Sequence, residues 1–411
     1  MTHEYPPNRT FDSVNISRVT ALRDHGFTLR QRQFLVTVMV HSGCFLERQY
    51  CTFTATARGQ NSRDFVARLA ARGFARAIEP GSARRGRLYH IHHKPLYEAI
   101  GLPNDRNRRL LSVGRMVERV MILDAVLTDR RCWWLSPEAD KRTFFGELRE
   151  SGPRPEEYPH ITFGLGPRKT VRCFPDKLPI GIMRDDPGRY VFVYLVTRPV
   201  PVDFRQFLQR HHDLLAALHT WTVRLLVPRR FSTSVALYKA ALREELWNPL
   251  NASVAKQLET YFRERREHGG HLGDPSDPYI SKAFRQHGGA RISALHQAWR
   301  REGDVVLWRS CGTSLRDDRT YGCSVCEIQM LNAQYLQLTG AIDREGWASR
   351  GAKRELRQVG PPGSTRSLNQ PPTPLGAPWP QTACNRLCGS NLARAAQRRG
   401  GALCRPMPGG L

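Results

Sequence analysis

Acidic residues are scarce in this sequence of 411 residues, in which 37 Asp and Glu stand against 63 Lys and Arg and leave a formal net charge of +26. A chain with this charge attracts polyanions and releases their counterions on binding. The excess is mostly arginine, whose planar guanidinium suits bidentate contacts with phosphate and guanine. The composition therefore favours an acidic partner, but by itself it does not separate DNA from RNA or from an acidic membrane surface.

Long hydrophobic runs are also lacking, since no stretch approaches the ~18 consecutive apolar residues of a membrane-spanning helix. The first residues, Met1-Thr-His-Glu-Tyr-Pro-Pro, have neither the basic start nor the apolar run of a secretory signal. We therefore expect a cytoplasmic protein without membrane insertion, whose cysteines are reduced.

Glycine-rich phosphate loops are absent as well. Nothing in the sequence fits G-x-x-x-x-G-K-[ST], and Gly164-Leu-Gly166 stops short of the G-x-G-x-x-G pattern. We accordingly expect no ATPase site, no dinucleotide site and no cofactor.

What the sequence does contain is most informative between residues 28 and 93. Thr28 is placed to cap a helix over 28–41, whose apolar set is predicted to be Leu29, Phe34, Leu35, Val38 and Met39. Ser42 to Phe45 predicts a turn, and 46–54 a short second helix. Asn61 or Ser62 is predicted to cap a third helix over 63–72 that Gly73 ends, and its apolar set is predicted to be Phe65, Val66, Leu69 and Ala70.

A basic β-hairpin follows, with strands predicted at 74–78 and 87–92. Helix, helix, third helix and basic wing is the order of a winged helix-turn-helix, in which a helix enters the major groove and the wing contacts phosphate or the minor groove. The alternative is a winged helix that contacts only protein, with its arginines as a solvated face. We expect duplex DNA binding, and the predicted DNA-binding residues are Arg63, Arg68, Arg72, Arg84, Arg85 and Arg87.

The chain is long enough for two or three domains, and 40% apolar residues suffice for real cores. A small α/β domain of mixed sheet is predicted from the strand, hairpin, strand, helix, strand pattern of residues 158–228, in which Tyr190 to Val196 is apolar throughout and should be a buried central strand. The complete prediction is an α+β or α/β multidomain chain: a flexible arm at 1–20, the winged helix at 20–100, a helical connector at 101–157, the α/β domain with a helical extension at 158–266, an irregular and partly helical region at 267–350, and a disordered Pro/Gly/Arg-rich tail at 351–411. The tail is either native or the product of a frameshift.

Over about residues 25 to 265 this order of elements resembles the replication-relaxation proteins of plasmids and integrative conjugative elements. The resemblance implies a second domain like a restriction-endonuclease core, a role in replication, transfer or transcription, and relaxase or conjugation proteins as partners. Such a core needs an acid after one strand and an acid-x-Lys triplet on the next, which together hold Mg²⁺. Pro175-Asp176 matches the first element, whereas Tyr190 to Val196 offers neither acid nor lysine.

We therefore interpret Asp176 as an ordinary turn aspartate and the α/β domain as a degenerate nuclease core without enzymatic activity. A Mg²⁺-dependent endonuclease that uses Asp176 is the alternative.

Other clusters that resemble metal or catalytic sites lack essential members. Cys323 and Cys326, with Cys311 upstream, are weak zinc candidates because no second pair lies close by in sequence. His90 and His92 should lie on the wing surface without a third ligand, and His211-His212-Asp213 should be a helix surface because no nucleophile pattern accompanies it. We expect no bound metal.

Overall fold

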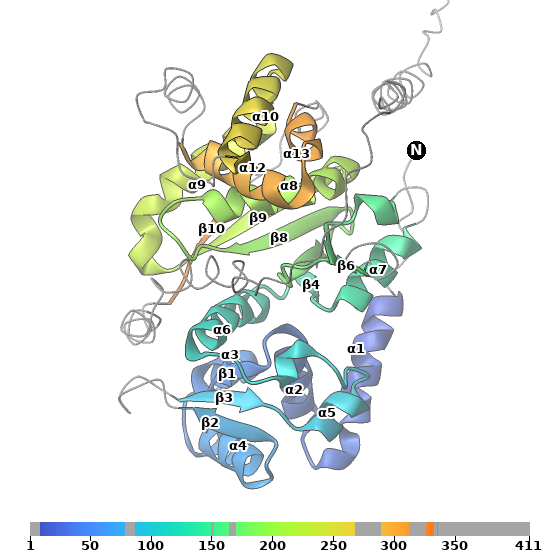
Figure 1. Cartoon of the computed structure of the whole chain (residues 1–411). Coiled ribbons are helices and arrows are strands. Elements are labelled where there is room, and N and C mark those ends of the chain that lie inside the picture. The colour runs from blue at the N-terminus through green and yellow to red at the C-terminus, as the bar shows by residue number, and fades with distance from the viewer. Residues whose placement is uncertain are drawn as a thin grey trace, which may run out of the picture. The chain divides into compact units, whose positions relative to one another are not determined.

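A computed structural model describes residues 9–78, 87–148, 152–163, 170–267, 289–311, 326–332 and 335, all within one compact unit that spans residues 1–350. The fold is of the mixed α+β class, with three sheets among these residues (Figure 1). The tail predicted for 351–411 lies outside the described residues.

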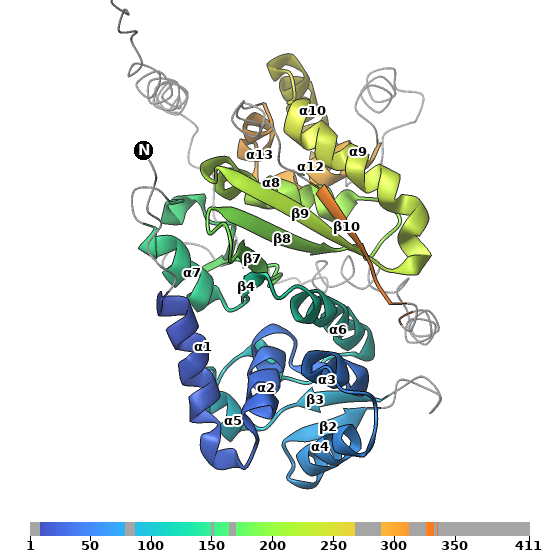
Figure 2. The same ribbon diagram turned by 180° about the vertical axis from the view of Figure 1, so that it is seen from behind.

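The N-terminal elements follow the predicted order closely. Their bounds are α1 Arg9–Ala21, α2 Leu29–His41, β1 Cys44–Leu46, α3 Glu47–Thr54, α4 Gln60–Ala71, β2 Ala75–Ile78, β3 Leu88–Ile91 and α5 Lys94–Ala99. Thr28 caps α2, as predicted, and does so in a reciprocal capping box with Gln31. β3 lies between β1 and β2 in an antiparallel sheet, and α4 packs beside β2 (Figure 2).

An aromatic cluster holds these helices together. Phe34, Phe45, Tyr50 and Phe65 come from α2, β1, α3 and α4, and the rings of Tyr50 and Phe65 stack with centroids 4.1 Å apart. All four side chains are buried. Leu29 was expected in this core, but it is 57% exposed because it stands in the first turn of α2, before the helix meets its neighbours.

Two features of this region differ from the prediction. Ser42 to Phe45 was expected to be a turn, yet Cys44 already begins strand β1, which pairs with β3. Gly43 makes the turn at φ +74°, where a Cβ atom would lie 2.2 Å from the carbonyl oxygen of Asn107. Only glycine fits there, because both the backbone angle and the contact exclude a side chain.

The expected flexible arm at 1–20 is wrong over residues 9–20, since α1 is a helix that packs against α2, and residues 1–8 lie outside the described residues. Arg18 of α1 donates two hydrogen bonds, of 2.7 and 2.8 Å, to the carboxylate of Asp140 on α7 (Glu138–Glu147). Both side chains are about nine-tenths buried. This bidentate pair fixes the helix to a segment more than a hundred residues away, which no local pattern predicts.

The central sheet has the strand order β10-β9-β8-β7-β4, in which β4, β7 and β8 form an antiparallel meander and β8, β9 and β10 run parallel. Helix α8 (Val202–Ala217) connects β8 to β9. The strand bounds are β4 Cys132–Leu135, β7 Ile180–Met183, β8 Arg189–Leu195, β9 Thr220–Val227 and β10 Cys326–Met330.

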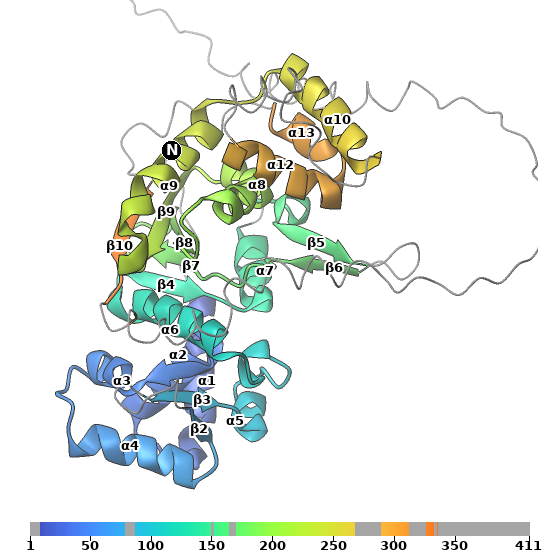
Figure 3. The same ribbon diagram turned by 60° about the vertical axis from the view of Figure 1, so that its left-hand side comes forward.

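Strand β8 is buried on both faces, as its uninterrupted apolar sequence predicts. Tyr190, Phe192 and Tyr194 face a core built with α8 and with α9 (Val235–Trp247). Val191, Val193 and Leu195 face the opposite core, to which α6 (Val113–Thr128) contributes (Figure 3). The two-residue period of a strand divides a continuous apolar run between two faces, so helices must cover both.

Residues 101–157 are more than the predicted helical connector. Strand β4 forms the edge of the central sheet, and α7 (Glu138–Glu147) buries Phe144 and Phe145 in the core that faces α8. The remaining strands, β5 (His160–Phe163) and β6 (Thr170–Cys173), form a separate antiparallel ribbon (Figure 3). The α/β domain therefore begins well before residue 158.

The region 267–350 is also more regular than expected where it is described. Helix α12 (Gly289–Glu302) packs against α8 and shares a core with α10 (Ala252–Glu267) and α13 (Val305–Arg309). Strand β10 completes the central sheet, with Ile328 opposite Leu225 of β9. Its sequence, Cys-Glu-Ile-Gln-Met, alternates apolar and polar residues but does not indicate that the partner strand lies about a hundred residues earlier.

Candidate nucleic-acid interface

Helix α4 divides cleanly into a buried and an exposed side. Ser62, Phe65, Val66 and Leu69 are buried against the aromatic core. The opposite stripe, at helical spacings of four, three and four residues, is exposed and consists of Gln60, Asp64, Ala67 and Ala71. Arg63 and Arg68 are exposed on either side of this stripe, which we call the α4 stripe.

The N-terminus of α4 is anchored by a carboxylate on α3. Glu47 accepts a hydrogen bond of 2.7 Å from the hydroxyl of Ser62 and one of 2.9 Å from Arg58 Nε. Partial burial acts to raise the pKa of Glu47, but these hydrogen bonds and the charges of Arg58 and Arg63 together lower it below its ordinary value. Glu47 therefore stays ionised and fixes the orientation of α4 relative to α3.

The helix begins earlier than predicted. Gly59 is its N-cap, and the Ser62 hydroxyl lies 3.3 Å from the Gly59 amide nitrogen, so neither Asn61 nor Ser62 caps it. The extra turn adds Gln60 and Asn61 to the exposed surface, two amide side chains absent from the predicted DNA-binding set. A glycine before a polar run was the available signal, but glycine is a weaker N-cap preference than serine or asparagine.

Arg72, a predicted DNA-binding residue, makes contacts within the fold instead of standing free. Its guanidinium donates to the carbonyl oxygen of His25 at 2.5 Å. It also lies over the rings of Phe74 and Phe27, at 4.5 and 5.7 Å from their centroids. Arg72 is exposed to solvent, but these contacts hold it against the protein, and we assign it a structural role.

The wing is described only at its base. Arg84 and Arg85 lie outside the described residues, and Arg87 is exposed immediately before β3. Arg76 is exposed on the adjacent strand β2, opposite His90 in the register, and was not among the predicted residues. His90 itself was expected on the wing surface but is 3% exposed, with its Nε2 atom 3.0 Å from the carbonyl oxygen of Asn107.

Asp176 is not an ordinary turn aspartate. Its carboxylate forms a hydrogen-bonded ion pair with Arg210 of α8, and its Oδ2 atom lies 3.8 Å from Nδ1 of His211. Lys141 belongs to the same cluster: its Nζ donates to the carbonyl oxygen of Leu178 at 2.7 Å, and burial lowers its pKa to about 8 although Asp176 opposes the shift. We call these four residues, Lys141, Asp176, Arg210 and His211, the Asp176 cluster.

His211 was expected on a helix surface, but it is 4% exposed in this cluster. Burial lowers its pKa to about 4, while Asp176 and the Phe207 carbonyl act in the opposite direction. The pattern His-His-Asp shows no apolar periodicity of its own, so the burial becomes visible only once α8 is placed on the sheet.

The cluster contains a single carboxylate. Asp185 and Asp186 are exposed in the turn before β8, and β8 supplies no acid or lysine. Within the described ranges no group of three His, Cys, Asp or Glu residues is arranged to hold a metal ion. The charged side chains of the Asp176 cluster therefore connect α7 and α8 to the turn that precedes β7, which is a structural role.

The zinc candidates are dispersed as far as they are described. Cys311 packs with the α10–α12–α13 core, whereas Cys326 starts β10 and packs on the central sheet. Cys323 lies outside the described residues. Burial raises the pKa of both described thiols, which disfavours the thiolate form that binds zinc.

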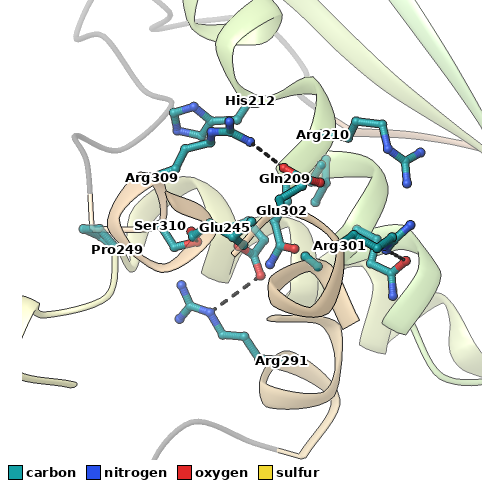
Figure 4. A pocket seen from close by; sticks show the side chains of 14 residues that line it. Gln209, Arg210, His212, Glu245, Pro249, Arg291, Arg301, Glu302, Arg309 and Ser310 are labelled. Carbon is teal, nitrogen blue, oxygen red and sulfur yellow. Dashed lines mark hydrogen bonds and ion pairs between the residues drawn. The ribbon is translucent and has the colours of Figure 1, made fainter. Parts of the chain in front are cut away.

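A pocket of about 630 Å³, counting its open mouth, lies between α8, α12 and α13 (Figure 4). Arg291 Nε stands 3.6 Å from a carboxylate oxygen of Glu245, and Arg309 donates to Glu302 at 3.3 Å. Arg291 and Arg309 are thus paired with acids, and Arg301, which also lines the pocket, donates to Gln206 Oε1 at 2.7 Å. Among the described residues, the exposed arginines beside the α4 stripe are the better candidates for an acidic partner.

No helix in the described ranges has the length and apolar character needed to cross a bilayer. Comparisons of the chain with protein-family models, with curated proteins and with solved structures find no match.

Proposed function

We propose that residues 20–100 form a winged helix-turn-helix that binds duplex DNA, with α4 entering the major groove. The observation that carries this proposal is the exposed side of α4, where Ala67 and Ala71 stand between Arg63 and Arg68. Small side chains let the helix approach the floor of a groove about 12 Å wide, and the flanking arginines reach phosphates or base edges. The side chains of Arg63 and Arg68 form no hydrogen bond or ion pair with other described residues.

Arg76 and Arg87 at the base of the wing support the same partner. Arg76 is exposed on β2 and Arg87 is exposed immediately before the neighbouring strand β3, in the sheet that α4 packs against. A basic wing beside a basic helix provides two contacts with one duplex, and a purely protein-binding winged helix has no need of this charge. The protein-only adaptor therefore remains the weaker candidate.

Fluorescence anisotropy of a labelled duplex pool with the full chain tests this function. We expect saturable binding at ~50 mM salt that weakens steeply as salt rises, because each phosphate contact releases a counterion. Absence of duplex binding at this salt concentration would contradict the proposal and favour a winged helix that contacts only protein.

We further propose that the protein is a sequence-specific or structure-specific accessory or regulatory factor of a bacterial mobile element, acting in replication, transfer or transcription. Support comes from the resemblance to replication-relaxation proteins and from the agreement of the predicted element order with the observed one over residues 28–41, 46–91 and 160–227. Relaxase or coupling-protein genes beside its own gene are the expected observation, and their products are the partners to test by co-purification.

The central sheet, in this proposal, is a nuclease-like scaffold without catalysis. We expect supercoiled plasmid to stay intact when incubated with the protein and Mg²⁺ or Mn²⁺. The physical reason is that Asp176 is paired with Arg210 and, among the described residues, belongs to no group of three His, Cys, Asp or Glu side chains that could hold a metal ion. Gel electrophoresis of the plasmid reads out the result. Metal-dependent nicking that disappears in the Asp176→Ala variant would instead establish the endonuclease alternative.

A further inference from the structure

An acidic side chain lies in the middle of the basic face of α4. Asp64 is exposed in the α4 stripe, one turn after Gln60 and one turn before Ala67 and Arg68. A carboxylate at this place repels phosphate, so it weakens binding to any duplex whose bases do not donate a hydrogen bond to it. Its position in the stripe calls for a compensating contact.

Asp64 is held by an amide and not by an arginine. Gln60 Nε2 donates to Asp64 Oδ1 at 2.6 Å, and within the described part of the chain neither Arg63 nor Arg68 forms an ion pair with Asp64. The hydrogen bond uses one donor of Gln60 and leaves the second carboxylate oxygen of Asp64 available. Gln60 and Asp64 thus present mainly acceptor atoms from the first two turns of α4.

Acceptor atoms at the N-terminal end of a groove-binding helix select bases that present amino groups in the major groove. Cytosine presents N4 there without an adjacent acceptor, and Asp and Glu accept from it. Adenine presents N6 beside the N7 acceptor and pairs best with the donor and acceptor of an amide, which an ionised carboxylate lacks. Thymine and guanine present O4 and O6 acceptors toward the same region, which repel the carboxylate.

We propose that Asp64 is a specificity-determining residue that reads cytosine in the major groove, with Gln60 fixing the orientation of its carboxylate. In this proposal Arg63 and Arg68 attract phosphate, and Asp64 lowers the affinity for any duplex that does not place a cytosine opposite its carboxylate. This inference rests on the proposed DNA-binding function and adds the base that the site prefers.

The test is selection of bound sequences from a random duplex pool by the full chain, followed by anisotropy on the selected duplex and on single-base changes. The wild type is expected to show one position at which cytosine is preferred about tenfold or more. Asp64→Ala is expected to lose this preference and to bind random duplex several-fold more tightly. Asp64→Asn is expected to move the preference from cytosine to adenine, because an amide pairs with adenine N6 and N7.

Glu98→Gln is the matched control, since it removes one negative charge from an exposed side chain on α5, outside the α4 stripe. It is expected to raise general affinity slightly and to leave every base preference unchanged. Duplex binding with the same base preferences in wild type, Asp64→Ala and Asp64→Asn would overturn the inference while leaving the proposed function standing. Absence of duplex binding by the wild type overturns both, so the two failures are distinguishable.

Discussion

Replacing Arg63 and Arg68 together by alanine is expected to lower duplex affinity at ~0.1 M salt by about a hundredfold and to leave the thermal midpoint unchanged. Each lost phosphate contact removes about one unit from the slope of log affinity against log salt, which at this concentration corresponds to roughly tenfold in affinity. The fold should not respond, because both side chains are exposed and make no hydrogen bond to other described residues. Anisotropy across a salt series measures the slope, and circular dichroism measures the midpoint.

Two comparisons make this result specific. Lys256→Ala with Arg266→Ala removes the same number of charges from exposed positions on α10, and should change affinity only slightly. Arg72→Ala should lower the midpoint, since its guanidinium lies over Phe74 and bonds to the His25 carbonyl. Equal losses of affinity from the α4 and α10 pairs would show that binding follows net charge, and the assignment of α4 as the groove-binding helix would be wrong.

Acidification from pH 6.5 to 4.5 is expected to destabilise the protein by several kcal/mol. The pKa of His41 is lowered to about 3, mainly by burial and further by the positive charges of Arg18 and Lys141. Burial likewise lowers the pKa of His211 to about 4. In the unfolded chain both histidines take up a proton near pH 6.5, whereas in the native state they remain neutral.

The sign follows from linkage. The unfolded state binds more protons below pH 6.5, so stability is fully present above that pH and is lost as pH falls toward the native pKa values. Each histidine contributes about 1.4 kcal/mol per pH unit in this window. Two such groups together amount to a large part of the ~5–15 kcal/mol by which domains are stable.

Urea unfolding at pH 7, 6 and 5 measures this dependence. His211→Phe removes one titrating group and suits the site, because the imidazole already packs against Phe207 with centroids 4.2 Å apart. That variant should show about half the pH slope of the wild type. His219→Gln changes an exposed histidine and should keep the full slope. If stability stays constant between pH 7 and 5, the two imidazoles are not held neutral in the native state.

Much of the local structure followed from the sequence. The helical spacing predicted a buried side of α4 made of Phe65, Val66, Leu69 and Ala70, and the first three are buried because a helix repeats every 3.6 residues whatever its neighbours are. Ala70 was wrongly included, since it lies at the edge of that side and is exposed. The apolar run of β8 correctly predicted a strand covered on both faces, because a strand directs successive side chains to opposite sides.

Only the tertiary structure decided which of the predicted site residues are free of contacts within the fold and which are held by them. Arg68 and Arg72 lie one turn apart and are both exposed, yet the side chain of Arg72 contacts Phe27 and His25 from a different segment, whereas that of Arg68 forms no hydrogen bond or ion pair with other described residues. Other contacts between distant segments are the ion pair of Asp176 with Arg210, the ion pair of Arg18 on α1 with Asp140, and the parallel pairing of β10 with β9. Periodicity and capping act within a few residues, and so the sequence by itself determined the elements and their buried sides. Ion pairs, cation–π contacts and parallel strand pairing join residues tens to hundreds of positions apart, which is why they depend on the packed chain.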